Sequence, residues 1–124
     1  MIIHRSTARQ RDIPDCHGGR GTVACTEYLT EHDNTALGIT LVHDDILPPG
    51  AAIGEHLHTG DEEVYIILEG TGSMTVDGVR QVVTGGDVCV TRSGHSHSLI
   101  NSGQKPLRLL VVGARVGTGR PPGV

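Results

Sequence analysis

Two histidine pairs are the residues in this chain best suited to chemistry. His56 and His58 flank a single residue in the middle of the sequence, and His95 and His97 do the same nearer the C-terminus. Because side chains alternate between the two faces of a β-strand, each pair presents both imidazoles on one face. A carboxylate, Glu63, follows the first pair. Three neutral imidazole nitrogens and one carboxylate oxygen form a competent ligand set for a divalent transition metal.

The composition favours short strands around an aliphatic core. A chain of 124 residues fits one domain, and it can bury enough surface to need no disulfide. It contains 18 glycines and two tyrosines, with no phenylalanine or tryptophan. No segment shows a sustained helical apolar period, so we expect little helix. Many short strands joined by tight turns predict an all-β sandwich or barrel.

Several functional classes are disfavoured by the same sequence. The net charge is −4 and there is no basic run, which argues against nucleic-acid binding. No apolar run approaches the roughly 20 residues of a membrane span, and the first residues lack the apolar segment of a signal peptide. The cysteines are odd in number and none lies in a C-x-x-C pair. We therefore expect a reduced cytoplasmic protein with no membrane contact.

Apolar runs and turn signals predict the order of the strands. The predicted strands cover residues 22–29, 36–42, 53–58, 63–68, 72–76, 79–83, 88–91, 97–100 and 107–112. Asp77-Gly78 predicts a hairpin turn. Asp44-Asp45 is expected to separate the second predicted strand from the first histidine pair. We divide the chain into an N-terminal arm (1–21) available for dimer contact, a barrel (22–113) and a flexible C-terminal tail (114–124).

The residues around both histidine pairs resemble the two motifs of the cupin family. Residues 50–70 read Gly, five residues, His-x-His, four residues, Glu, six residues, Gly. Residues 86–101 match the second motif from Gly through His to Asn, except that Arg92 stands where the family usually has proline. The resemblance implies a single small jelly-roll β-barrel (a double-stranded β-helix) with a metal inside. It does not imply one reaction, because a fold hosts many chemistries.

The resemblance also implies which residues hold the metal. The four ligands would be His56, His58, Glu63 and His97, binding one divalent transition metal per chain (Mn, Fe, Co, Ni, Cu or Zn). Glu62 is a competing carboxylate, but choosing it would leave Gly70 one residue too far along the motif. The residues themselves support the same set, since alternation places the ligands on the inward faces of three strands.

Tyr65 is the candidate catalytic residue. It shares a strand face with Glu63, so its hydroxyl could donate a proton to a metal-bound substrate. The alternative is a core tyrosine bonded to the backbone. His95 is expected in a solvated loop, and His43 is expected at the surface with the barrel mouth as the alternative. We assign no role to His17.

Two functions are consistent with such a site. The first is a metal-dependent enzyme acting on a small oxygen-rich metabolite, by isomerase, dioxygenase, lyase or decarboxylase chemistry. The alternative is a non-catalytic, metal-dependent module that binds or senses a small carboxylate. In either case Arg92, Arg80 or Arg108 could hold a carboxylate of the ligand. Small cupins commonly pair through edge strands, so we expect a homodimer.

Overall fold

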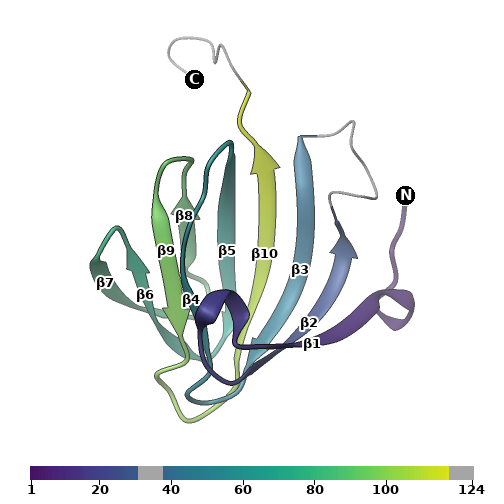
Figure 1. The fold of residues 1–124 in the computed structure, drawn as a ribbon. Coiled ribbons are helices and arrows are strands. Elements are labelled where there is room, and N and C mark those ends of the chain that lie inside the picture. The colour runs from purple at the N-terminus through teal and green to yellow at the C-terminus, as the bar shows by residue number, and fades with distance from the viewer. Residues whose placement is uncertain (31–37, 118–124) are drawn as a thin grey trace.

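The computed structural model describes residues 1–30 and 38–117, which form two antiparallel sheets. Figure 1 shows the two sheets as the walls of a jelly roll. The six-stranded sheet has the order β1 (Arg9–Pro14), β2 (Thr22–Leu29), β3 (Ile39–Leu47), β10 (Leu107–Arg115), β5 (Asp61–Glu69) and β8 (Val88–Thr91). The four-stranded sheet has the order β4 (Ala52–Leu57), β9 (Ser96–Ile100), β6 (Thr71–Val76) and β7 (Val79–Thr84). The predicted all-β jelly roll is confirmed. None of the described residues forms a helix long and apolar enough to cross a membrane.

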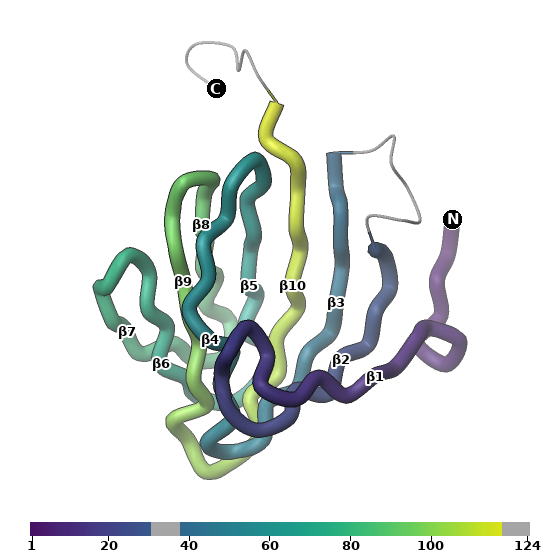
Figure 2. The backbone as a smooth tube through the Cα atoms, viewed as in Figure 1, coloured from purple at the N-terminus to yellow at the C-terminus, as the bar shows by residue number. Residues whose placement is uncertain are grey.

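The N-terminal segment belongs partly to the larger sheet. After the short 3-10 turn η1 (Arg5–Thr7), β1 pairs antiparallel with β2 at the sheet edge, and Arg11 lies opposite Cys25. A second 3-10 turn, η2 (Cys16–Gly18), then packs against β4. Figure 2 shows this part of the tube looping past β4 before the chain enters β2. Residues predicted as an arm therefore contribute an edge strand and a cover over one side of the barrel.

One strand continues further than predicted at a charged pair. The prediction ended a strand at Val42 because Asp44-Asp45 resembles a turn, but β3 runs through both aspartates. Asp44 points to the outer face, where it pairs with Arg5 and Arg108 at 2.7 Å each. The arginines neutralise a carboxylate that would otherwise disfavour this part of the strand. Positions 36 and 37 of the predicted strand lie outside the described residues.

The last strand also runs further than predicted. β10 continues past Val112 to Arg115, because Gly113, Ala114 and Arg115 pair with the first residues of β5. Positions 118–124 of the predicted tail lie outside the described residues. The remaining predicted strands are confirmed to within two residues at each end, and those over 22–29 and 88–91 match at both ends. The hairpin turn at Asp77-Gly78 is confirmed as well, and both of its residues have positive φ.

The aliphatic core and the polar site lie on the same inner faces, at different positions along the strands. Inward residues of β5 change from Glu63 and Tyr65 to Ile67, and those of β9 change from His97 to Leu99. The five largest of the fully buried side chains are aliphatic: Leu47, Ile67, Leu99, Leu107 and Leu109. Burial of this area is the main stabilising force, so the fold does not depend on the polar residues for its core.

We predict that Leu109→Ala lowers the free energy of unfolding by about 2–5 kcal/mol, because it replaces part of a fully buried side chain with a cavity. The matched control is Leu57→Ala, since Leu57 is 62% exposed; it should change stability by less than about 0.5 kcal/mol. Urea unfolding followed by circular dichroism measures both. Equal losses in the two variants would contradict this assignment of the core.

Candidate metal centre

Four side chains from three parts of the barrel converge at one point. His56 on β4 lies directly opposite His97 on β9, Glu63 points inward from β5, and His58 follows the end of β4. The Nε2 atom of His97 is 3.0 Å from Nε2 of His56 and 3.0 Å from Nε2 of His58. It is also 3.2 Å from Oε1 of Glu63. The structure therefore brings together all four residues predicted as metal ligands.

Hydrogen bonds at the outer side of two rings fix which nitrogen faces the centre. Nδ1 of His56 lies 2.8 Å from the carbonyl oxygen of Gly54, and Nδ1 of His58 lies 3.1 Å from Oδ2 of Asp61. A carbonyl or carboxylate oxygen only accepts, so both Nδ1 atoms donate. A neutral ring that donates from Nδ1 carries a bare lone pair on Nε2. The two lone pairs thus point into the cluster, as metal-binding imidazoles require.

The third ring is held in the same way by a buried hydroxyl. Nδ1 of His97 is 2.7 Å from Oγ1 of Thr91, and both side chains are almost completely buried. The hydroxyl can accept from Nδ1, which again leaves Nε2 as an acceptor at the centre. Burial lowers the pKa of His56 to about 4, so its imidazole is neutral near pH 7.

The separations in the cluster fit a shared cation. Two ligands bound at about 2.1 Å with angles between 90° and 109° lie about 3.0–3.4 Å apart. Four of the six distances between these nitrogen and oxygen atoms are 3.0, 3.0, 3.2 and 3.5 Å. Bare lone pairs and a carboxylate at these separations repel one another, and a divalent ion between them removes that repulsion. The donor set, three nitrogens and one oxygen, suits a transition metal.

The competing carboxylate points elsewhere. Glu62 lies on the outer face of β5, where its Oε2 is 3.6 Å from Nη1 of the exposed Arg92. Period-two alternation thus separates Glu62 from Glu63. Arg92, which replaces the usual motif proline, makes a surface pair with Glu62. Arg108 is bound to Asp44 on the outer face of the larger sheet. Neither arginine lines the cavity beside the cluster, contrary to the role considered for them from sequence.

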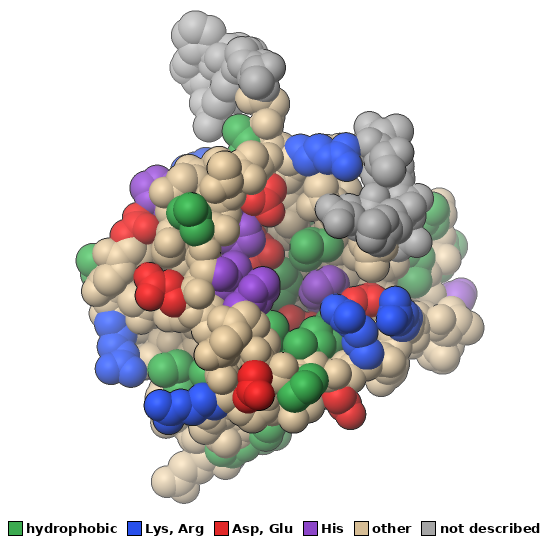
Figure 3. All heavy atoms as spheres, in the orientation of Figure 1, with side chains coloured by type: hydrophobic (Ala, Val, Ile, Leu, Met, Phe, Trp, Pro, Cys, Tyr) green, Lys and Arg blue, Asp and Glu red, His purple; other side chains and the backbone are tan. Residues whose placement is uncertain are grey.

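A cavity of about 280 Å³ opens beside the four residues. Figure 3 shows histidine side chains gathered in a hollow on this face, with arginine and acidic side chains nearby. The arginine that lines the cavity is Arg11, and the aliphatic part of the wall includes Ile13, Ile53 and Val111. The apolar wall shields the polar groups from water, which strengthens their electrostatic interactions with a bound ligand.

Tyr65 lies inside the barrel beside Glu63, as alternation predicted. Its ring packs in the core, and its hydroxyl oxygen is 3.4 Å from Nε2 of His97 rather than at a backbone group. Burial, and then the charge of Glu63, raise the pKa of Tyr65 well above its usual value. The phenol is therefore protonated at neutral pH. It is a hydrogen-bond donor at the edge of the cluster.

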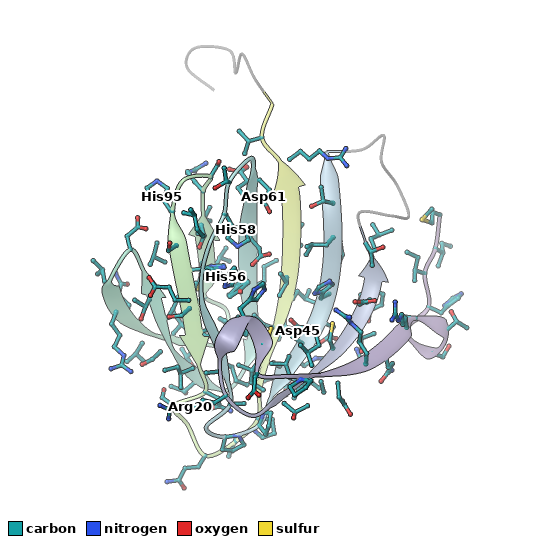
Figure 4. All side chains as sticks on the ribbon, viewed as in Figure 1. Arg20, Asp45, His56, His58, Asp61 and His95 are labelled. Carbon is teal, nitrogen blue, oxygen red and sulfur yellow. The ribbon has the colours of Figure 1, made fainter. Side chains whose placement is uncertain are left out.

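Of two further histidines at the cavity, sequence reasoning gave no role to His17 and favoured the surface over the barrel mouth for His43. The ring of His17 stacks on His56, with centroids 3.7 Å apart and planes 10° from parallel. No local signal identifies it, because it comes from the irregular turn η2. His43 lines the cavity and does not lie on the outer surface. It alternates in step with Leu41 and Leu47, so it would have been placed inside if the predicted strand had continued past Val42. His95 is exposed and pairs with Asp77, as expected for a loop histidine. In Figure 4 it lies apart from His56 and His58.

Comparison with known proteins gives a consistent result. The family model described as "Cupin domain" matches residues 44–113. The oxalate-binding protein of Thermotoga maritima is 35% identical over 115 residues, which cover 90% of this chain and 92% of that protein. The crystal structure of a predicted oxalate decarboxylase from Thermotoga maritima has a TM-score of 0.86 at 34% identity, covering 94% of this chain and 100% of that one. KdgF from a Halomonas species has a TM-score of 0.75 at 9% identity, covering 95% and 96%, and shares the fold.

We predict that Glu63→Gln weakens binding of a divalent transition metal at this centre at least tenfold. Even residues that only orient a ligand typically contribute about 10–100-fold to metal affinity. The neighbouring Glu62→Gln makes the same chemical change on the outer face and should bind like the wild type. Isothermal titration of chelator-treated protein measures both affinities. The reverse ranking would show that the inward carboxylate is misassigned.

Proposed function

The chain belongs to the cupin family, and we propose that it is a metal-dependent enzyme acting on a small dicarboxylate of the oxalate type. The observation that carries the proposal is the convergence of His56, His58, Glu63 and His97 at the edge of a partly apolar cavity. A divalent metal held there would supply a Lewis acid with open positions for carboxylate oxygens. The chain's own residues must then orient the ligand, exclude water and provide a proton.

The size and lining of the cavity support a small anionic ligand. Its volume of about 280 Å³ lies near the lower end for small-molecule sites, which begin at about 300 Å³. Arg11 and His17 line it, so it contains donors for carboxylate oxygens. Burial lowers the pKa of His17, so this ring acts as a neutral hydrogen-bond donor. The similarity to an oxalate-binding protein and to a predicted oxalate decarboxylase supports oxalate within this class of ligands.

Tyr65 is the proposed proton donor. Its hydroxyl lies next to Nε2 of His97, at the boundary between the cluster and the cavity. When the bond between the two carbons of oxalate breaks, one carbon leaves as carbon dioxide, and the other must gain one proton to become formate. The protonated phenol is placed to deliver that proton, which solvent then restores. A general acid positioned in this way typically contributes about 10²–10⁴-fold to the rate.

A second candidate function is metal-dependent binding without turnover. It is favoured by the similarity to the oxalate-binding protein of Thermotoga maritima. The same cluster and cavity would serve it, and Tyr65 would then donate only a hydrogen bond to the bound ligand. The two functions differ in whether oxalate is consumed.

We predict that metal-loaded protein releases formate from oxalate, and that Tyr65→Phe lowers this turnover by about ten- to a thousandfold with metal content unchanged. The substitution keeps the ring, and so the packing, and removes only the hydroxyl. Formate release with and without dioxygen, together with elemental analysis, measures both quantities.

Tyr28→Phe is the matched control. Tyr28 is the other tyrosine, and its hydroxyl lies near Arg5 rather than near the cluster. This variant should keep wild-type turnover. Oxalate that binds tightly without being consumed would establish the binding module instead. Oxalate that neither binds nor reacts would contradict the ligand class, and turnover that survives Tyr65→Phe would contradict the role of the hydroxyl.

A further inference from the structure

A second group of metal-ligating side chains lies on β2 and β3, away from the histidine cluster. Cys25 on β2 is directly opposite Asp45 on β3, and Glu27 is directly opposite His43. Alternation places all four on the inner face of the sheet. This block of four residues (Cys25, Glu27, His43 and Asp45) therefore presents one thiol, two carboxylates and one imidazole from two neighbouring strands. Nothing in the proposed function uses these four residues as a group.

Their ligand atoms lie close together. The sulfur of Cys25, a carboxylate oxygen of Glu27 and a ring nitrogen of His43 are all within 4.8 Å of one another. Nδ1 of His43 is 4.0 Å from Oδ1 of Asp45. Ligand atoms around a tetrahedral zinc ion lie about 3.3–3.7 Å apart. The ligand atoms here would therefore need to move inward by about 1 Å to bind one zinc ion together.

Two carboxylate oxygens in the block have no hydrogen-bond donor among the described residues. Oε2 of Glu27 and Oδ1 of Asp45 are buried without such a partner, and the two residues are only 8% and 6% exposed. Leaving a buried charged acceptor unsatisfied is costly. Arg11 binds the other oxygen of Glu27 at 2.6 Å, while Arg9 is 3.7 Å from Oε2, beyond hydrogen-bond distance. Arg11 thus orients Glu27, and Oε2 is left with the longer ion pair to Arg9 and no hydrogen-bond donor among the described residues.

We propose that Cys25, Glu27, His43 and Asp45 form a second metal site for a borderline divalent ion such as Zn²⁺. A mixed set of sulfur, nitrogen and oxygen donors is typical of that ion. The ion replaces the missing donors at the two orphaned oxygens. Binding also requires Cys25 to release its thiol proton to solvent, forming one metal–sulfur bond.

Binding of the ion must overcome the raised pKa of Cys25, which burial and then the charge of Asp45 cause. One further feature supports the site. His43 and Asp45 also line the cavity, which gives an ion a path to the block from solvent. Figure 4 shows Asp45 apart from His56 and His58, and Glu63 of the histidine cluster lines the same cavity as Asp45. The two sites therefore share one opening.

The test is a Co²⁺ titration of the full chain, followed by absorption and by equilibrium dialysis. The expected result is two equivalents per chain and a near-ultraviolet charge-transfer band from thiolate to cobalt. The histidine cluster contains no sulfur, so only a cysteine site can produce that band. Cys25→Ser should lose the band and one equivalent. Glu63→Gln should keep the band, which separates this site from the first.

The other two cysteines provide matched controls. Cys16→Ser and Cys89→Ser should both retain the band, because neither thiol belongs to the block. If Cys25→Ser fails to fold, His43→Gln keeps the thiol and should weaken the second equivalent at least tenfold. Saturation at one equivalent, the absence of a thiolate band in the wild type, a band that persists in Cys25→Ser, or its loss in Cys16→Ser would each overturn the proposal.

Discussion

The mutual repulsion of three bare imidazole nitrogens and one carboxylate inside the barrel is the constraint on which the site depends. Donation from Nδ1 of His56 and His58 to Gly54 and Asp61 turns both Nε2 lone pairs inward. These outer hydrogen bonds hold the rings in an arrangement that would otherwise relax. A divalent cation between these groups would convert that repulsion into attraction, so the four side chains are already arranged as a metal would require them.

The scaffold can sustain this arrangement because its stability comes from elsewhere. The fully buried leucines lie further along the same strands, where Ile53 of β4 lies opposite Leu99 of β9. His56 lies opposite His97, and the register shifts between Ile53 and His56. This irregularity lets Ile53 and His56, which are three residues apart, both face the interior of the barrel. A shift of one residue would turn every side chain of the strand to the opposite face. The geometry of the site thus depends on the irregularity in β4 as well as on core packing.

Much of the site could be predicted because strand alternation and motif spacing are local properties. They were sufficient to place Glu63 inward and Glu62 outward, and to place Tyr65 beside the cluster. His17 could not be found in this way, since its stacking on His56 depends on a turn that crosses from the edge of the other sheet. The extension of β3 through Asp44 was missed for a similar reason: Arg5 and Arg108, which neutralise it, are distant in sequence. Contacts between distant segments are what pattern reasoning lacks.

The central claim is that the histidine cluster holds a metal, and the most direct test is elemental analysis of untagged protein beside His97→Gln. His97 is the residue whose Nε2 contacts the other three ligands, and it is 1% exposed. After reconstitution with Mn, Fe, Co, Ni, Cu and Zn in turn, the wild type should carry about one equivalent more of at least one of these metals than the variant. Equal contents in the two proteins for every metal, with both folded by circular dichroism, would contradict the account.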